Sequence, residues 1–199
     1  VNANGLYVLL AGANDLLNAI QVPANQNATA MTNTGVGASN AVAGAVRSLA
    51  TLGAKNILVL NLPDISKTAR FTTGSGASGA LFMQNGVQAF NNDIAGRIAG
   101  LGLNSDVNVT VFNLSAIFDT LLANASRFGF SITNREYLGI LQAGGNPGDV
   151  GQYIFWDGIH PTTKAHAVFA QVLTEALNPE FVLGTAATQG TSALIASDM

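Results

Sequence analysis

The sequence predicts one α/β domain, or a large part of one, built on a parallel β-sheet. Apolar runs over residues 6–11, 56–62 and 107–114 have the length and composition of buried strands. A segment of helical periodicity follows each run, and Gly, Pro and Asn mark the boundaries. This strand–helix alternation predicts a three-layer α/β/α arrangement, with helices on both faces of the sheet.

The first two strands are followed by different kinds of segment. The run that begins at Leu6 ends at Gly12, and its uninterrupted apolar character predicts a strand buried on both faces. The polar stretch over 18–35 predicts an irregular loop. A helix is predicted after it, ending at Gly53, from apolar residues at helical spacing. These residues are Val42, Ala45, Val46, Leu49 and Leu52. The second strand is closed by Pro63.

The rest of the chain continues the alternation. A loop over 66–79 precedes a helix whose apolar face is Met83, Val87, Phe90, Ile94, Ile98 and Leu101. A short helix over 117–123 and a glycine-rich loop over 144–151 follow the third strand. The last predicted helix runs from Thr162 to Leu177, with Ala165, Val168, Phe169, Val172, Leu173 and Ala176 facing inward. The domain is therefore expected over 1–178, with 179–199 as a tail or linker.

Composition narrows the possible functions. Hydrophobic residues make up 48% of the 199 residues and charged residues 10%, which excludes an overall disordered chain. A net charge of −3 without blocks of like charge gives no sign of a nucleic acid or an anionic membrane as partner. The apolar runs are too short for a transmembrane segment. The absence of cysteine excludes disulfides, and no cluster at metal-ligand spacing is present.

The segment FWDGIHPTTKAH, 155–166, holds both histidines of the chain. Asp157 precedes His160 by three residues, a spacing that lets the carboxylate meet the imidazole Nδ1 and fix its tautomer. Pro161 restricts the backbone of His160 to extended conformations. This pattern predicts an acid–base pair. The alternative is that Asp157 only caps a turn and His160 is a surface residue.

Asn14 follows the first strand within AGAND, 11–15. Ligands of parallel α/β folds bind outside the carboxyl ends of the strands, where Asn14 and His160 are expected to be neighbours. An amide N–H₂ in that place can donate to a developing oxyanion. The alternative is an ordinary strand-ending turn, in which Asn is common.

Together, AGAND, LNLPD (60–64) and DGIHPT (157–162), in this order, resemble one family, the SGNH hydrolases or GDSL-type lipases and esterases. The resemblance extends from about Leu6 to Leu177. It implies a flavodoxin-like fold, with Asn14 as oxyanion donor and Asp157 and His160 as catalytic acid and base. It also implies a small-molecule ester or lipid as substrate and no metal or organic cofactor.

The family's nucleophile block, Gly-Asp-Ser, is absent, as is the Gly-x-Ser-x-Gly motif of other serine hydrolases. Ser75 and Ser78, in GSGASG, are interpreted as flexible loop residues. The resemblance therefore implies that the fold lacks its first strands here and that the serine lies upstream. The sheet order expected from the family is 2-1-3-4-5, so the first strand of this chain would be a bare edge. Such an edge is an aggregation hazard, and the chain alone is expected to need an upstream segment of its own domain.

Three further expectations complete the interpretation. His166 is predicted to be a half-buried structural residue, and Phe155 and Trp156 to anchor their loop in the core rather than bind substrate. Low charge and abundant Asn, Thr, Gly and Ala suggest a secreted or cell-surface protein, of bacterial origin. An alternative function stays open, a non-catalytic α/β module that binds a carbohydrate or lipid.

Overall fold

A computed structural model describes residues 1–73 and 76–177. The chain divides into two compact units. The first comprises residues 1–66 and 79–115, and the second comprises residues 67–78 and 116 onward. Short 3₁₀ helices occur at Pro23–Asn25, Ile65–Lys67, Ala77–Gly79, Ala125–Phe128 and Val150–Gln152.

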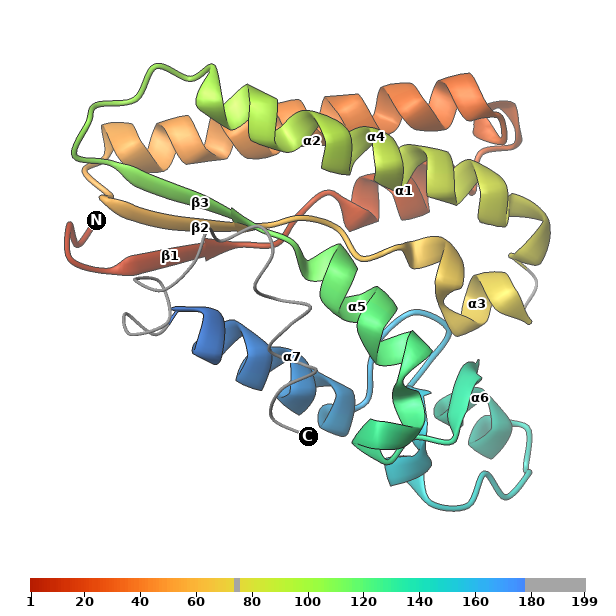
Figure 1. Cartoon of the computed structure of the whole chain (residues 1–199). Coiled ribbons are helices and arrows are strands. Elements are labelled where there is room, and N and C mark those ends of the chain that lie inside the picture. The colour runs from red at the N-terminus through yellow and green to blue at the C-terminus, as the bar shows by residue number, and fades with distance from the viewer. Residues whose placement is uncertain (74–75, 178–199) are drawn as a thin grey trace. The chain divides into compact units, whose positions relative to one another are not determined.

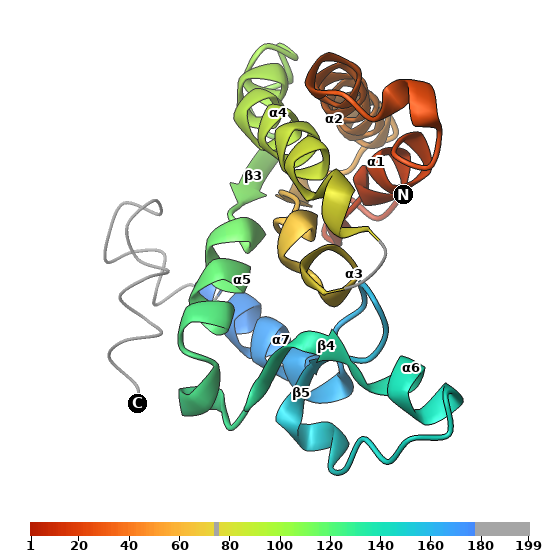
Figure 2. The ribbon, with the colours of Figure 1, turned by 90° about the vertical axis from the view of Figure 1, so that its right-hand side faces the viewer.

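The first unit is built on a three-stranded parallel sheet with the order β1-β2-β3. Its strands are β1 (Leu6–Leu9), β2 (Asn56–Leu60) and β3 (Asn108–Phe112). Its helices are α1 (Ala13–Ala19), α2 (Ala28–Thr51) and α4 (Ala80–Ala99). Figures 1 and 2 show α2 and α4 side by side over one face of this sheet. The predicted parallel α/β class is confirmed, and the order of the strands in the sheet follows their order in the chain.

The central strand β2 and the edge strand β1 differ in how far their side chains are buried. In β2, Ile57 to Leu60 are buried, as expected for a strand covered on both faces. In β1 the prediction of burial on both faces is wrong, because Leu6 and Val8 are 51% and 52% exposed, and Leu10, just after the strand, is 54% exposed. Within the described residues β1 pairs only with β2, so it lies at the edge of its sheet and one face of the strand is open.

The prediction of an irregular loop over residues 18–35 is wrong for most of its length. Helix α1 ends at Ala19, and α2 begins at Ala28, after Asn27 accepts a 2.8 Å hydrogen bond from the backbone N–H of Ala30. This is an N-cap that satisfies one of the free donors of the first turn. The buried face of α2 consists largely of small residues: Met31, Gly35, Ala38, Ser39, Val42, Ala43 and Val46.

The predicted apolar face of α4 is confirmed except at Leu101, because the helix ends at Ala99. Its buried residues Met83, Val87, Phe90, Ile94 and Ile98 recur at helical spacing. At the interface with α2, the buried Ser39 donates a hydrogen bond to Asp93, which also pairs with Arg97. The Ser39 hydroxyl also donates to the Val36 carbonyl at 2.9 Å, so this buried polar group is satisfied.

The second unit holds a small parallel sheet and several short helices. Its elements are α3 (Ala69–Thr72), β4 (Ile132–Glu136), α6 (Tyr137–Gln142), β5 (Tyr153–Phe155) and α7 (Thr163–Leu177). Helix α5 (Leu114–Ala123) begins in the first unit and continues into the second. The buried core of the second unit is Ala69, Phe118, Leu121, Ala125, Phe130, Ile154, Phe155 and Ala165. The β4–β5 pair and α6 were not predicted, whereas α7 lies where the last helix was expected.

Candidate active site

The candidate active site of the second unit is the loop 156–162 between β5 and α7. Two backbone hydrogen bonds hold it: Trp156 N–H donates to the His160 carbonyl at 2.8 Å within the loop, and Thr162 N–H donates to the Ile154 carbonyl of β5 at 2.8 Å. The buried Thr162 hydroxyl also donates to the Tyr153 carbonyl at 2.9 Å. The loop therefore has one tightly defined path.

Asp157 organises the interior of this loop. Its Oδ1 accepts hydrogen bonds from the backbone N–H groups of Ile159, at 2.9 Å, and His160, at 2.7 Å. Its Oδ2 lies 2.7 Å from His160 Nδ1. The prediction that this carboxylate meets the imidazole is confirmed. Asp157 also caps the turn through Oδ1, so it both caps the turn and contacts the histidine ring.

The electrostatics of Asp157 favour its ionised form. Partial burial raises the pKa of the carboxyl group, but the backbone N–H groups of His160 and Ile159 and the His160 ring together outweigh this effect. The net result is a lowered pKa for Asp157. An ionised carboxylate can only accept, so Nδ1 of His160 carries the proton in the neutral ring.

His160 presents its other ring nitrogen outward. The side chain is 68% exposed, and Nε2 has no hydrogen-bond partner among residues 1–73 and 76–177. With the proton on Nδ1, Nε2 holds a free lone pair. The ring is thus oriented on one side and available on the other, which is the arrangement of a general base.

Asn14 lies at the carboxyl end of β1, in the first turn of α1. Gly12, at the N-cap of α1, has a φ of 109°, a conformation that favours glycine, and a Cβ there would lie 2.8 Å from Phe90 Cε2. Asn14 is exposed, and its amide makes no hydrogen bond within the described part of the chain. The proximity of Asn14 to His160 stays a prediction.

Three other residues of the candidate segment carry rings and differ in exposure. His166 is exposed, so the prediction of half-burial is wrong: it lies on the outer side of α7, with its ring edge-on to Phe169 at 6.5 Å between centroids. Phe155 is fully buried, as predicted. Trp156 is 40% exposed and stacks on Tyr137 with 5.5 Å between centroids, so it does not anchor the loop in the core.

Of the two serines in GSGASG, Ser78 is exposed on the 3₁₀ helix Ala77–Gly79, and Ser75 lies outside the described residues. Across the described residues, no group of three or more His, Asp or Glu side chains could hold a metal ion. No helix in the described ranges is long and apolar enough to cross a membrane.

Sequence reasoning missed Thr162 as a structural part of this site. The residue lies just before α7, and the backbone N–H of Ala165 donates to its hydroxyl at 3.4 Å. Thr before a run of helical periodicity is a helix-start signal, so this role was accessible from the sequence. Glu136 and Gly139, which line a pocket beside the loop, were also missed, because no local pattern predicted α6.

Comparison with known proteins gives a consistent result. The sequence model of GDSL-like Lipase/Acylhydrolase matches residues 1–173. A GDSL esterase/lipase of Arabidopsis thaliana is 34% identical over 94 residues, which are 42% of this chain and 26% of the relative. Thermolabile hemolysin of Vibrio parahaemolyticus is 26% identical over 190 residues, 88% of this chain and 42% of the relative.

A third relative, GDSL esterase/lipase 7 of Arabidopsis thaliana, is 26% identical over 84% of this chain and 51% of its own length. The chain thus spans about a quarter to a half of the length of these relatives. The family match covers AGAND and DGIHPT, the two blocks on which the resemblance depended.

Proposed function

The chain belongs to the GDSL-like lipase/acylhydrolase family, and from this premise we propose that the full protein hydrolyses carboxylic esters through a serine nucleophile. The observation that carries the proposal is the hydrogen bond between Asp157 and His160, which leaves Nε2 exposed and unbonded within the described ranges. The substrate is a small-molecule ester or a lipid. The chemistry uses side chains alone, with no metal or organic cofactor.

The proposed reaction has two similar halves. The serine Oγ attacks the ester carbonyl carbon while Nε2 of His160 accepts the serine proton. Asp157 stabilises the resulting imidazolium, and the amide of Asn14 donates to the oxyanion. The bond from carbon to the alcohol oxygen then breaks, and Nε2 gives its proton to the leaving alcohol. Water repeats the sequence on the acyl-enzyme and releases the acid.

The nucleophile is proposed to lie upstream of Val1. Two facts support this: the sequence contains no Gly-Asp-Ser block, and the matched relatives are two to four times longer than the region matched. Residues 1–199 alone are then inactive. Labelling the full protein with a fluorophosphonate and mapping the modified peptide tests this point. We expect the label outside residues 1–199; a label on Ser78 contradicts the proposal.

An upstream segment of the same domain is also proposed to cover β1. The exposed Leu6, Val8 and Leu10 on an edge strand support it, because bare apolar edges promote aggregation. Purified residues 1–199 are expected to aggregate, to form swapped dimers or to melt without a sharp transition. A monomer with a single sharp thermal transition overturns this part of the proposal.

Replacing the proposed base is the direct test of the activity. His160→Ala in the full protein is expected to reduce hydrolysis of p-nitrophenyl esters to background. His166→Ala is the matched control, since it removes the other, exposed histidine six residues away, and it should retain activity. Near-normal turnover by His160→Ala refutes the mechanism. A wild-type protein that binds esters or glycans without turnover favours the alternative binding module.

We further propose a secreted or cell-surface location, in a bacterium. The support is compositional: low charge together with abundant Asn, Thr, Gly and Ala. Fractionation of the producing cells and immunoblotting of the medium, membrane and cytoplasm test it. Recovery of the protein in the cytoplasm alone contradicts it.

A further inference from the structure

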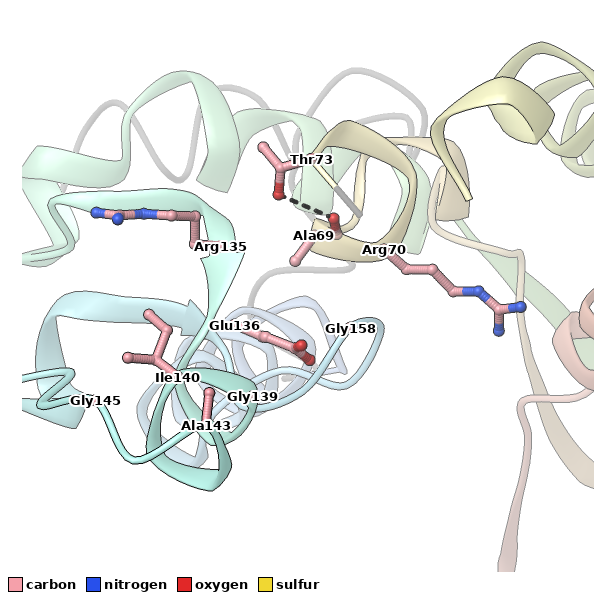
Figure 3. A pocket seen from close by; sticks show the side chains of 10 residues that line it. All are labelled: Ala69, Arg70, Thr73, Arg135, Glu136, Gly139, Ile140, Ala143, Gly145 and Gly158. Carbon is pink, nitrogen blue, oxygen red and sulfur yellow. Dashed lines mark hydrogen bonds between the residues drawn. The ribbon is translucent and has the colours of Figure 1, made fainter. Parts of the chain in front are cut away.

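A pocket of about 470 Å³ lies beside the candidate catalytic loop, within the second unit (Figure 3). It is formed by α3, the end of β4, α6 and Gly158. Gly158 belongs to the loop between Asp157 and His160, and its carbonyl accepts a 2.7 Å hydrogen bond from the backbone N–H of Arg70. A group bound in this pocket therefore touches the loop that holds the proposed base.

The pocket contains one carboxylate, that of Glu136, without a partner among the described residues. Glu136 points between Gly139 and Gly158 (Figure 3). A Cβ at Gly139 would collide with Glu136 Oε1, and one at Gly158 would lie 3.6 Å from Oε2. Among residues 1–73 and 76–177, the Glu136 carboxylate forms no hydrogen bond or ion pair. Gly139 thus leaves the space that the carboxylate occupies, and Gly158 lies within ordinary contact distance of it.

Two arginines line the same pocket without neutralising Glu136. Figure 3 shows the side chains of Arg70 and Arg135 directed away from it and away from each other. The Arg70 guanidinium carbon lies 5.5 Å from the centre of the Phe71 ring. Thr73 is engaged elsewhere, as its hydroxyl donates to the Asn134 carbonyl at 2.8 Å. Glu136 is therefore the acidic group of this pocket, and its carboxylate is available to a cationic ligand.

The remaining lining is apolar or lacks a side chain. Methyl and methylene groups come from Ala69, Ile140 and Ala143, and backbone atoms from Gly139 and Gly158. One carboxylate among such groups lacks the six or more oxygen ligands that Ca²⁺ requires. It suits a large organic cation, whose alkyl groups contact the apolar wall while its charge meets the carboxylate.

We propose that this pocket binds a substituted ammonium group of the substrate, with Glu136 as its counter-charge. Binding of the ammonium group does not depend on the proposed ester hydrolysis, but its assignment to the substrate does. The inference narrows the proposed substrates to esters that carry such a cation. Choline esters and their neutral 3,3-dimethylbutyl isosteres, in which carbon replaces nitrogen, differ in charge at nearly constant shape. They isolate the contribution of Glu136.

The experiment compares kcat/KM of the full protein for butyrylcholine and for 3,3-dimethylbutyl butyrate. A partly exposed ion pair predicts a preference for the cation of roughly fivefold. Glu136→Gln is expected to reduce this ratio to about one. Glu175→Gln, the same change of charge in the last turn of α7, should retain it. An unchanged ratio in Glu136→Gln overturns the inference, as does a wild-type preference for the neutral ester.

A second variant keeps the charge and moves it. Gly139→Ala places a methyl group against Glu136 Oε1, so the carboxylate must rotate away. Gly139 lies inside α6, where alanine is the better helix former, so the fold is expected to survive. The ratio should again fall toward one, while the thermal midpoint stays at or above that of the wild type. A stable Gly139→Ala protein with the wild-type ratio contradicts the geometry.

Binding separates this inference from the proposed function. Saturation-transfer NMR of the full protein with choline and with 3,3-dimethylbutan-1-ol needs no turnover. One outcome is that the protein hydrolyses no ester but binds choline, and that Glu136→Gln loses this binding. This outcome supports the ammonium site and refutes the proposed esterase activity. Ester hydrolysis with equal binding of the two alcohols, in wild type and variant alike, sustains the esterase and refutes the ammonium site.

Discussion

The loop 156–162 and the first turn of α1 present their functional side chains in opposite ways. Asp157 and His160 are fixed by hydrogen bonds within one short segment, and Asp157 alone accepts three. Asn14 is positioned by backbone alone, after the left-handed Gly12, and its amide has no partner among the described residues. In the proposed mechanism, the groups that set geometry are hydrogen-bonded to the protein, whereas the groups proposed to meet substrate have no partner among the described residues.

The two carboxylates near Gly158 differ in the same way: Asp157 precedes it in the sequence, and Glu136 lies near it in the pocket. Asp157 is bonded to the loop and its pKa is lowered, so it remains an acceptor for the histidine. Glu136 has no such bonds within the described ranges, so its charge is free for a ligand. If this division of roles is correct, substitutions in the bonded group disturb the catalytic machinery itself. Substitutions in unbonded groups remove one interaction with substrate.

The largest effect is expected from Asp157→Asn in the full protein. The amide can still accept from the backbone N–H groups, so the loop should fold, but it no longer holds the ring with a negative charge. We expect kcat/KM for p-nitrophenyl butyrate to fall roughly 10⁴-fold. Asp149→Asn is the matched control, because this turn carboxylate accepts the Gly151 N–H at 2.8 Å and no other donor among the described residues. A loss below tenfold would mean that Asp157 only caps the turn.

A smaller effect is expected from Asn14→Ala, because it removes one donor to the oxyanion. The rate constant kcat should fall about 10²–10³-fold, with KM changed little, since the interaction strengthens in the transition state. Asn18→Ala, one turn later on the same exposed side of α1, is the control and should match the wild type. Full activity in Asn14→Ala would assign this residue to an ordinary strand-ending turn.

The contrast also explains how much the sequence could predict. The Asp157–His160 pair was predictable because its partners are three residues apart and the contact is local. The α4 face was predictable because large apolar residues recur at regular spacing. The first half of α2 was missed because Gly35, Ala38 and Ser39 form its buried face and give a weak periodic signal.

Elements and sites that depend on tertiary contacts were less accessible. Strand β4 has the sequence ITNRE, which is mostly polar, and its strand character depends on pairing with β5. Glu136 gained its place in a pocket only because α3, α6 and Gly158 meet around it. The exposure of β1 depends on its position at the sheet edge, which its own apolar composition does not reveal.

The smallest expected effect concerns pH. The pKa of Asp157 is lowered in the folded protein, so its charge stabilises the fold fully above the unfolded pKa of about 3.8 and less as pH falls through the folded pKa. Urea unfolding of the full protein and of Asp157→Asn at pH 5 should therefore give unfolding free energies that differ by less than about 1 kcal/mol. The difference should shrink below about pH 4. A difference that grows between pH 5 and pH 3 would mean that the folded protein prefers the protonated carboxyl, and the loop could not then hold an ionised Asp157 against His160.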